Sequence, residues 1–238
     1  MKLKLPLNEF GLSPLDVEEF EKYVLVKKFN WDYGLALNFQ RALTGFVRET
    51  GKPWIIACSH PDVLTHGRGL QKARKGQVLA LEDYNPSAHP HLPVPLFQIE
   101  RGGGLTFHHP GQLIIYPIVR LHPQKLGLSH LVDGLLESVQ ESLQELGVKD
   151  LDHKRELLGL WARSQKLASV GIAIDRMVTL HGLALNVQNF QSLKDKLSFL
   201  APCGMEFKIY TSVEELTGKK IDPEDLADKV IRRLTHAW

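Results

Sequence analysis

Cysteine is nearly absent from this chain of 238 residues, which has only two, Cys58 and Cys203. Two cysteines in so long a chain do not form a disulfide framework, so both thiols are expected to be reduced. No run approaches the roughly 18 consecutive apolar residues of a membrane span. Residues 1–9 also lack the long apolar stretch of a signal peptide. We therefore expect a cytoplasmic protein without a membrane partner.

A strong charge of either sign is also missing. The 29 lysine and arginine residues nearly balance the 27 aspartate and glutamate residues, which leaves a net charge of +2. This balance argues against an extended nucleic-acid surface. One local basic cluster (Arg68, Lys72, Arg74 and Lys75) is either a solvated loop or a docking patch for acidic partners.

The apolar pattern predicts an α/β fold with mixed α+β character, in which helices flank a mixed β-sheet. Strands are expected near 23–26, 53–58, 77–81, 95–99, 113–119, 157–163, 166–174 and 177–187. Helices are expected at 14–21, from Asn30 or Asp32 through Phe46, from Ser129 to Gly147, and from Asp222 to about 235. Residues 1–20 are interpreted as an N-terminal extension and 21–238 as the main domain, with a small C-terminal lobe from about 205.

The two cysteines occupy different sequence settings. Cys203 lies between Pro202 and Gly204, where neither a helix nor a regular strand can continue, so the thiol is expected on a shaped loop. Cys58 ends an apolar run and is interpreted as a buried strand residue. A reduced thiol outside the core is a candidate nucleophile, because the thiolate is the strongest nucleophile among the side chains near neutral pH.

Three further segments carry candidate functional groups. Residues 101–112 combine an arginine, three consecutive glycines and two histidines, which suits close approach of a ligand; the alternative is a simple glycine-rich hairpin. Lys166 opens an apolar strand where partial desolvation would suit proton transfer, although a strand-end lysine commonly extends into water. In residues 181–187, Gly182 and Ala184 share one strand face and leave room beside it; alternatively, this face packs on a helix.

Together these segments resemble the lipoyl(octanoyl) transferase family, within the biotin/lipoate protein ligase superfamily. The family pattern is approximately Arg-Gly-Gly-x-x-Thr-Tyr-His-Gly-Pro-Gly-Gln. Residues 101–112 match it, except that Phe107 replaces the tyrosine and His109 replaces a glycine. Residues 60–67 resemble the earlier His-Pro-x-x-x-Thr-x-Gly block, and residues 166–171, 181–186 and 202–204 match the remaining blocks in order. The likeness covers about 23–218.

The resemblance implies an acyltransferase with a biotin/lipoate protein ligase-like catalytic domain. It implies that Cys203 becomes acylated and that Lys166 lowers the pKa of its thiol. The substrate is then expected to contact Arg101, Gly102, Gly103, Gly104, Leu105, Thr106, Phe107, His108, Ser169, Val170, Gly171, Gly182, Leu183 and Ala184.

The resemblance also implies the partners of the reaction. The donor is octanoyl-acyl carrier protein, whose thioester is carried on a phosphopantetheine arm, so no separate cofactor or metal is expected. The acceptor is a lysine on lipoyl domains of 2-oxoacid dehydrogenase complexes or on the glycine cleavage H protein. Octanoyl transfer would be the first step of endogenous protein lipoylation.

Two other functions remain open from the sequence. An ATP-dependent lipoate ligase, or a related lipoyl amidotransferase, shares the implied fold, but the ligases need a nucleotide site and no nucleophilic cysteine. A metal-binding protein is suggested only by the eleven histidines. Their spacing is poor for a metal site, with no His-x-x-x-His on a helix and no Cys-x-x-Cys pair.

Overall fold

The computed structural model describes residues 5–69, 92–122, 125–154, 158–197 and 209–236. Its main feature is an eight-stranded sheet in the order β1-β2-β3-β7-β11-β10-β9-β8. These strands are β1 (Val17–Glu19), β2 (Val24–Lys28), β3 (Trp54–Cys58), β7 (Gln112–Ile118), β8 (Leu151–Lys154), β9 (Gly159–Ala162), β10 (Gln165–Asp175) and β11 (Val178–Asn186). Strands β2 and β3 are parallel, whereas the other neighbours are antiparallel.

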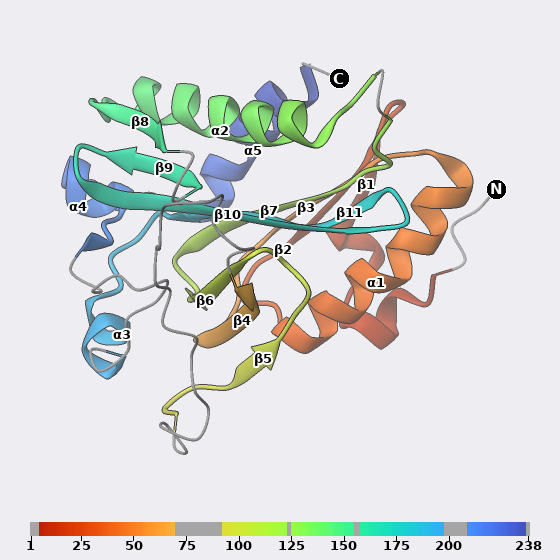
Figure 1. The fold of residues 1–238 in the computed structure, drawn as a ribbon, viewed down its shortest axis with the longest axis horizontal. Helices are drawn as coiled ribbons and strands as arrows, with labels where there is room; N and C mark the ends of the chain where they lie inside the picture. Colours follow the sequence, from red (N-terminus) through yellow and green to blue (C-terminus); the bar gives the residue numbers. More distant parts are fainter. Residues whose placement is uncertain (1–4, 70–91, 123–124, 155–157, 198–208, 237–238) are drawn as a thin grey trace, which may run out of the picture.

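A second sheet of three strands has the order β5-β4-β6. It consists of β4 (Val63–Gly69), β5 (Leu96–Gln98) and β6 (Gly103–His108). In Figure 1 this sheet and α1 (Tyr33–Thr50) lie below the large sheet, whereas α2 (Leu128–Glu145) and α5 (Pro223–His236) cover its opposite face. Two short helices, α3 (Gln191–Lys196) and α4 (Val213–Thr217), follow the last strand. The predicted mixed sheet flanked by helices is confirmed.

Local chemistry sets the ends of the long helices. Asp32 caps α1 by accepting a hydrogen bond from the Leu35 N–H at 2.9 Å, and Gly51 ends the helix in a left-handed conformation with φ of 71°. Asp222 accepts from the Glu224 N–H at 2.9 Å, just before α5 begins at Pro223. Both caps agree with the predicted helix starts.

Strand β7 lies between the two apolar cores. Ile115 packs on one face with Val139 of α2 and Val230 of α5. Ile114 packs on the other face with Phe39 of α1. The near-continuous apolar sequence of this strand follows from burial on both faces.

One prediction of local structure is wrong. Residues 14–21 do not form a helix: Pro14–Asp16 is a single 3-10 turn, and β1 then pairs with β2 at the edge of the large sheet. The acidic residues Glu18 and Glu19 favoured a helix in the sequence, but strand pairing overrides that local preference. Helix α2 begins at Leu128, one residue before the predicted start at Ser129.

Other predictions lie outside the described residues. These are the strand at 77–81 and the basic residues Lys72, Arg74 and Lys75. Among the described helices, none is long and apolar enough to cross a membrane.

Candidate active site

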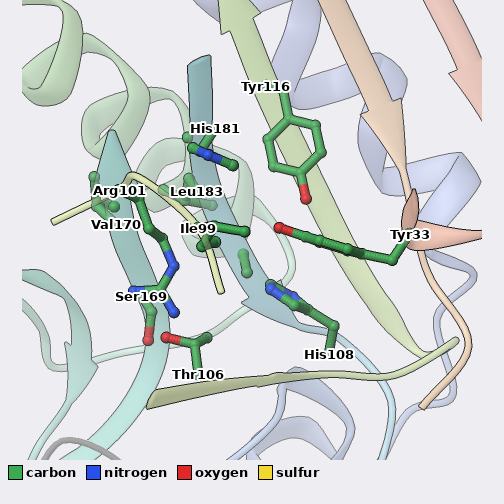
Figure 2. Close-up of a pocket in the computed structure, with 13 residues that line it drawn as sticks. Tyr33, Ile99, Arg101, Thr106, His108, Tyr116, Ser169, Val170, His181 and Leu183 are labelled. Atoms are coloured by element: carbon green, nitrogen blue, oxygen red, sulfur yellow. The ribbon is translucent and has the colours of Figure 1, made fainter. Parts of the chain in front are cut away.

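A pocket with an empty volume of about 370 Å³ lies between the small sheet and strands β10 and β11. Nine of the predicted substrate-binding residues line it, and they come from three separate segments. These are Arg101, Thr106 and His108, residues 169–171 of β10, and residues 182–184 of β11. Figure 2 shows Arg101, Thr106, His108 and Ser169 around one cavity. The fold therefore brings three of the sequence blocks together.

Arg101 is buried in the wall of this pocket. Its guanidinium donates to the carbonyl oxygen and to Oγ1 of Thr65, both at 2.9 Å, and to the carbonyl oxygen of Gly102 at 2.9 Å. A Cβ atom at Gly171 would lie only 2.9 Å from Cδ of Arg101. A glycine in β10 is therefore what allows the arginine side chain to lie across that strand.

The remaining predicted substrate contacts, Gly102, Gly103, Gly104, Leu105 and Phe107, are not among the residues that line the pocket. Side chains alternate between the two faces of a strand. Thr106 and His108 face the cavity, and Leu105 and Phe107 belong to an apolar cluster elsewhere. The glycines shape the backbone instead, since Gly103 has a φ of 82°.

Gly182 has a structural role that the sequence interpretation missed. A Cβ atom there would lie 2.1 Å from the carbonyl oxygen of Ile115 and 2.8 Å from Cδ of Pro117. The absence of a side chain therefore permits close contact between β11 and β7, besides leaving room for a ligand.

Four residues that the sequence did not single out also line the pocket: Tyr33, Ile99, Tyr116 and His181. His181 directly precedes the predicted residue Gly182, and Tyr116 is a polar group within an apolar strand, so both carried a weak signal. Tyr33 is the first residue of α1 and reaches the pocket only through the tertiary fold.

A buried histidine fixes the orientation of the Tyr116 hydroxyl. His60 Nδ1 lies 2.7 Å from the carbonyl oxygen of Trp31, which can only accept, so Nδ1 carries the proton. His60 Nε2 therefore accepts from the Tyr116 hydroxyl at 3.0 Å. Burial lowers the pKa of His60 to about 4 and raises the pKa of Tyr116 well above its ordinary value. Both groups are thus neutral near pH 7, and the Tyr116 oxygen offers only lone pairs to the pocket.

A chain of hydrogen bonds links His108 to Lys166. Thr211 donates its N–H to the Lys166 carbonyl oxygen at 3.0 Å and accepts from Asn186 Nδ2 at 3.0 Å. Asn186 Oδ1 then accepts from Gln112 Nε2 at 2.9 Å, and Gln112 Oε1 accepts from His108 Nδ1 at 3.0 Å. The Thr211 carbonyl oxygen can only accept, so Asn186 must donate from Nδ2 and accept at Oδ1. Gln112 must then donate from Nε2, which leaves its Oε1 to accept. His108 consequently presents an unprotonated Nε2, 3.4 Å from Thr65 Oγ1.

Lys166 is buried, with 5% of its surface exposed. It lies opposite Trp161 of β9, next to a bulge in β10, and its Nζ is 5.7 Å from the centroid of the Trp161 ring. The alternative of a strand-end lysine extending into water does not fit this burial. Lys166 does not itself line the pocket, which begins three residues later at Ser169.

The two cysteines differ in what the structure describes. Cys203 lies outside the described residues. Cys58 ends β3 and is fully buried, as predicted. Burial raises the pKa of its thiol well above the ordinary value. Cys58 therefore stays a neutral thiol near pH 7 and is not a nucleophile.

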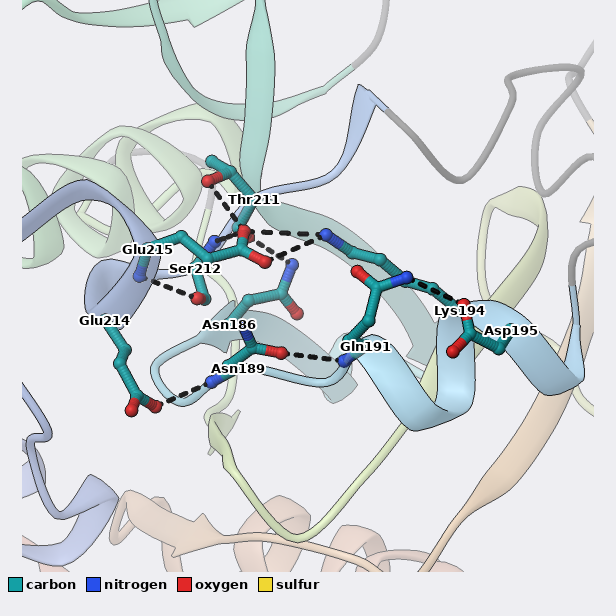
Figure 3. A network of polar contacts seen from close by, with 9 residues as sticks. All are labelled: Asn186, Asn189, Gln191, Lys194, Asp195, Thr211, Ser212, Glu214 and Glu215. Carbon is teal, nitrogen blue, oxygen red and sulfur yellow. Dashed lines mark hydrogen bonds and ion pairs between the residues drawn. The ribbon is translucent and has the colours of Figure 1, made fainter. Parts of the chain in front are cut away.

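A polar network joins the described residues on either side of 198–208 (Figure 3). Lys194 of α3 pairs with Glu215 of α4 at 3.1 Å, and Glu214 accepts from the Asn189 N–H at 2.8 Å. Glu215 also accepts from the Thr211 hydroxyl at 3.0 Å. The chain before and after the segment that contains Cys203 is thus held beside the end of β11.

Comparison with known proteins matches residues 32–235 to the lipoyl protein ligase A/B catalytic domain. The chain belongs to this family. It is 33% identical over 178 residues to an octanoyltransferase of Alkaliphilus metalliredigens, covering 71% of this chain and 72% of that protein. It is 32% identical over 207 residues to an octanoyltransferase of Syntrophobacter fumaroxidans, covering 85% and 86% respectively.

The solved structures confirm the fold. A crystal structure of lipoate-protein ligase A bound with ATP superimposes with a TM-score of 0.68 at 17% sequence identity. The match covers 90% of this chain and 83% of that one. The fold expected from the family resemblance is therefore shown.

His109, which replaces a glycine of the family pattern, packs away from the pocket. Its buried ring lies over Phe190 with 4.8 Å between ring centroids, and its Nδ1 accepts from the Gly111 N–H at 3.2 Å. It is not among the residues that line the cavity. The extra ring fills a space between β6 and α3.

We expect the buried histidines to make the protein sensitive to mild acid. Burial lowers the pKa of His60 and His109 to about 4 and of His181 to about 3, and the pKa of His108 lies well below its ordinary value. In the unfolded chain these histidines titrate near pH 6.5. Below that pH the unfolded state binds more protons, so stability falls by about 1.4 kcal/mol per pH unit for each histidine.

Urea unfolding between pH 7.5 and 4.5 measures this effect. Stability should be constant above about pH 6.5 and fall continuously below it. In a His109→Gly protein, the slope of unfolding free energy against pH should be smaller by the contribution of one histidine, about 1.4 kcal/mol per pH unit. A flat profile down to pH 5 in the unchanged protein would contradict the assignment of neutral, buried histidines.

Proposed function

We propose that this protein transfers an octanoyl group to a lysine of lipoyl domains. The observation that carries the proposal is the sequence identity of 33% and 32% to two octanoyltransferases, over most of this chain and of each relative. The pocket is consistent with this substrate, since the apolar residues Ile99 and Ala184 and two glycines are among those that line it. Each buried methylene of the acyl chain would contribute about 0.8 kcal/mol.

The proposed reaction has two steps at Cys203. The thiolate attacks the thioester carbonyl carbon of the donor, a new thioester forms on Cys203, and the donor thiolate leaves. The amine of the acceptor lysine then attacks this thioester, an amide forms and the Cys203 thiolate leaves. The amine gives up a proton in the second step. The first step converts one thioester and one thiolate into another thioester and another thiolate of similar energy, so no ATP is required.

Lys166 is proposed to assist both steps. As an ammonium it would stabilise the Cys203 thiolate, and in its neutral form it would accept the proton of the incoming amine. Its burial supports this role, because electrostatic interactions are stronger away from water. Tyr210, which follows Cys203 by seven residues in the sequence, forms a bridge with Lys166.

The proposed donor is octanoyl-acyl carrier protein, and the acceptors are lipoyl domains and the glycine cleavage H protein. A carrier-bound thioester supplies the activated acyl group without a nucleotide or metal. Among the described residues, no group of three or more metal-ligating side chains comes together.

An assay without ATP tests the function. Purified protein, octanoyl-acyl carrier protein and an unmodified lipoyl domain are mixed, and the lipoyl domain is analysed by intact mass. We expect one octanoyl amide per lipoyl domain, because the donor thioester already carries the activation energy. Adding ATP and free lipoate should neither accelerate modification nor release pyrophosphate. Modification that requires ATP would instead support the lipoate ligase alternative.

A further inference from the structure

The acyl pocket has two chemically different ends. In the pairing of β10 with β11, Ser169 is opposite Ala184 and Ile172 is opposite His181. The lining residues of β11 run from Ala184 back to His181. In Figure 2, Thr106 and Ser169 lie on one side of the cavity, whereas Tyr116 and His181 lie on the opposite side.

The reacting end of the pocket is the end at Ser169. This assignment rests on the proposed function of Lys166. Lys166 precedes Ser169 by three residues on the same strand and therefore lies beyond the Ser169 end of the pocket. Its side chain reaches back to the level of Ser169, because a Cβ atom at Gly159, which is paired with Ser169, would lie 3.2 Å from Lys166 Cε. An acyl group that reacts at this level extends its chain toward His181.

The distance between the ends matches an eight-carbon chain. Three residues of a β-strand, from Ala184 to His181, advance about 10 Å. An extended chain advances about 1.2 Å per bond, so the seven carbon–carbon bonds of an octanoyl group span about 8 to 9 Å. The methyl end of such a chain would reach the level of His181.

Two ring side chains, from β7 and β11, line the far end of the pocket. The rings of His181 and Tyr116 are both buried and meet edge to face, with 6.2 Å between their centroids. Tyr116 is fixed by its hydrogen bond to His60, and the His181 backbone N–H donates to Gln40 Oε1 of α1 at 2.8 Å. The Tyr116 ring cannot withdraw without breaking a buried hydrogen bond, and the bond to Gln40 holds the backbone of His181 in place.

Two features of His181 are not explained by packing. Its φ of 60° lies in the left-handed region, which is uncommon for a residue other than glycine. Its buried Nε2 has no hydrogen-bond partner among the described residues. An unpaired imidazole nitrogen makes this end of the pocket polar, so a longer apolar chain meets both a steric and a desolvation barrier.

We propose that His181, backed by Tyr116, closes the acyl pocket and limits the chain that this enzyme accepts to about eight carbons. The residue determines specificity and takes no part in the chemistry. Its effect is to exclude straight acyl chains of ten or more carbons.

The variant His181→Gly tests this proposal. Glycine adopts a φ of 60° without strain, so the backbone is preserved while the ring is removed. We expect the ratio of kcat/KM for decanoyl-carrier to that for octanoyl-carrier to rise about tenfold, the factor that burial of two more methylene groups provides. His181→Asn, which also tolerates this backbone and keeps a shorter polar side chain, should give a smaller rise.

The matched control is Met177→Gly. Met177 has a φ of 69°, is exposed, and lies in the turn between β10 and β11, outside the pocket. It should leave the chain-length ratio unchanged. A ratio for His181→Gly within twofold of the unchanged protein, with octanoyl transfer intact, would overturn the proposal and leave the proposed function standing.

Binding of unreactive ligands separates the two proposals completely. Octanoyl and decanoyl amides of pantetheine cannot transfer their acyl groups, so calorimetry with them measures the pocket alone. His181→Gly should tighten decanoyl-amide binding about tenfold relative to octanoyl-amide binding. This result would support the length limit even if no transfer were observed, and equal changes for the two ligands would refute it.

Discussion

A Cys203→Ala protein is expected to form no octanoyl-enzyme and to transfer at least about a thousandfold more slowly than the unchanged protein. Without the thiolate, the donor thioester has no nucleophile at which to leave its acyl group. Intact mass after incubation with octanoyl-acyl carrier protein measures the first effect, and acceptor modification measures the second.

The matched control is Cys58→Ala, which removes the other thiol. Cys58 is fully buried and burial raises its pKa well above the ordinary value, so it should accept no acyl group. This variant should gain one octanoyl mass and keep its transfer rate, with a modest loss of stability from the small cavity. Full acylation of Cys203→Ala would exclude the proposed thioester.

The strands and helices with strong apolar periodicity were predictable from sequence. Helices α1, α2 and α5 and strands β3, β7, β10 and β11 all lie close to their expected positions. Strands β4 and β6 were not predicted as strands, because glycines and polar residues interrupt their alternation. A Cβ atom at Gly67 would lie 2.3 Å from the carbonyl oxygen of Gly103, so these glycines serve the contact between two strands. Such a contact is visible only after folding.

The candidate site was predictable where the sequence blocks supply its walls. Residues 169–171 and 182–184 line the pocket from two paired strands. The sequence did not reveal which residues of each block line the pocket and which support the structure around it. Gln112 and Asn186 connect His108 to the strand of Lys166, and Phe107 packs in a core cluster. Tyr33 comes from a helix with no motif at all, since only the packing of α1 brings its ring to the cavity.

Replacing Lys166 by methionine should slow octanoyl transfer by at least about tenfold, because two steps lose their partner. Methionine retains an apolar stem in this buried position but provides neither a positive charge nor a proton acceptor. Alkylation of Cys203 by iodoacetamide near neutral pH should also slow, and its pH midpoint should move upward, since removing a nearby positive charge makes the thiolate less favourable. Lys166→Arg should restore the alkylation profile but not the full transfer rate, because arginine does not release its proton.

The control for this prediction is Lys154→Met. Lys154 Nζ lies 4.2 Å from the same Trp161 ring that faces Lys166, but Lys154 is on β8 and does not line the pocket. Its loss removes a cation near the same ring and should change neither alkylation nor transfer. Circular dichroism and unfolding curves establish that each variant is folded. Identical alkylation profiles for the unchanged protein and Lys166→Met would mean that Lys166 acts through packing alone, since a charge near the thiolate must shift the pH midpoint.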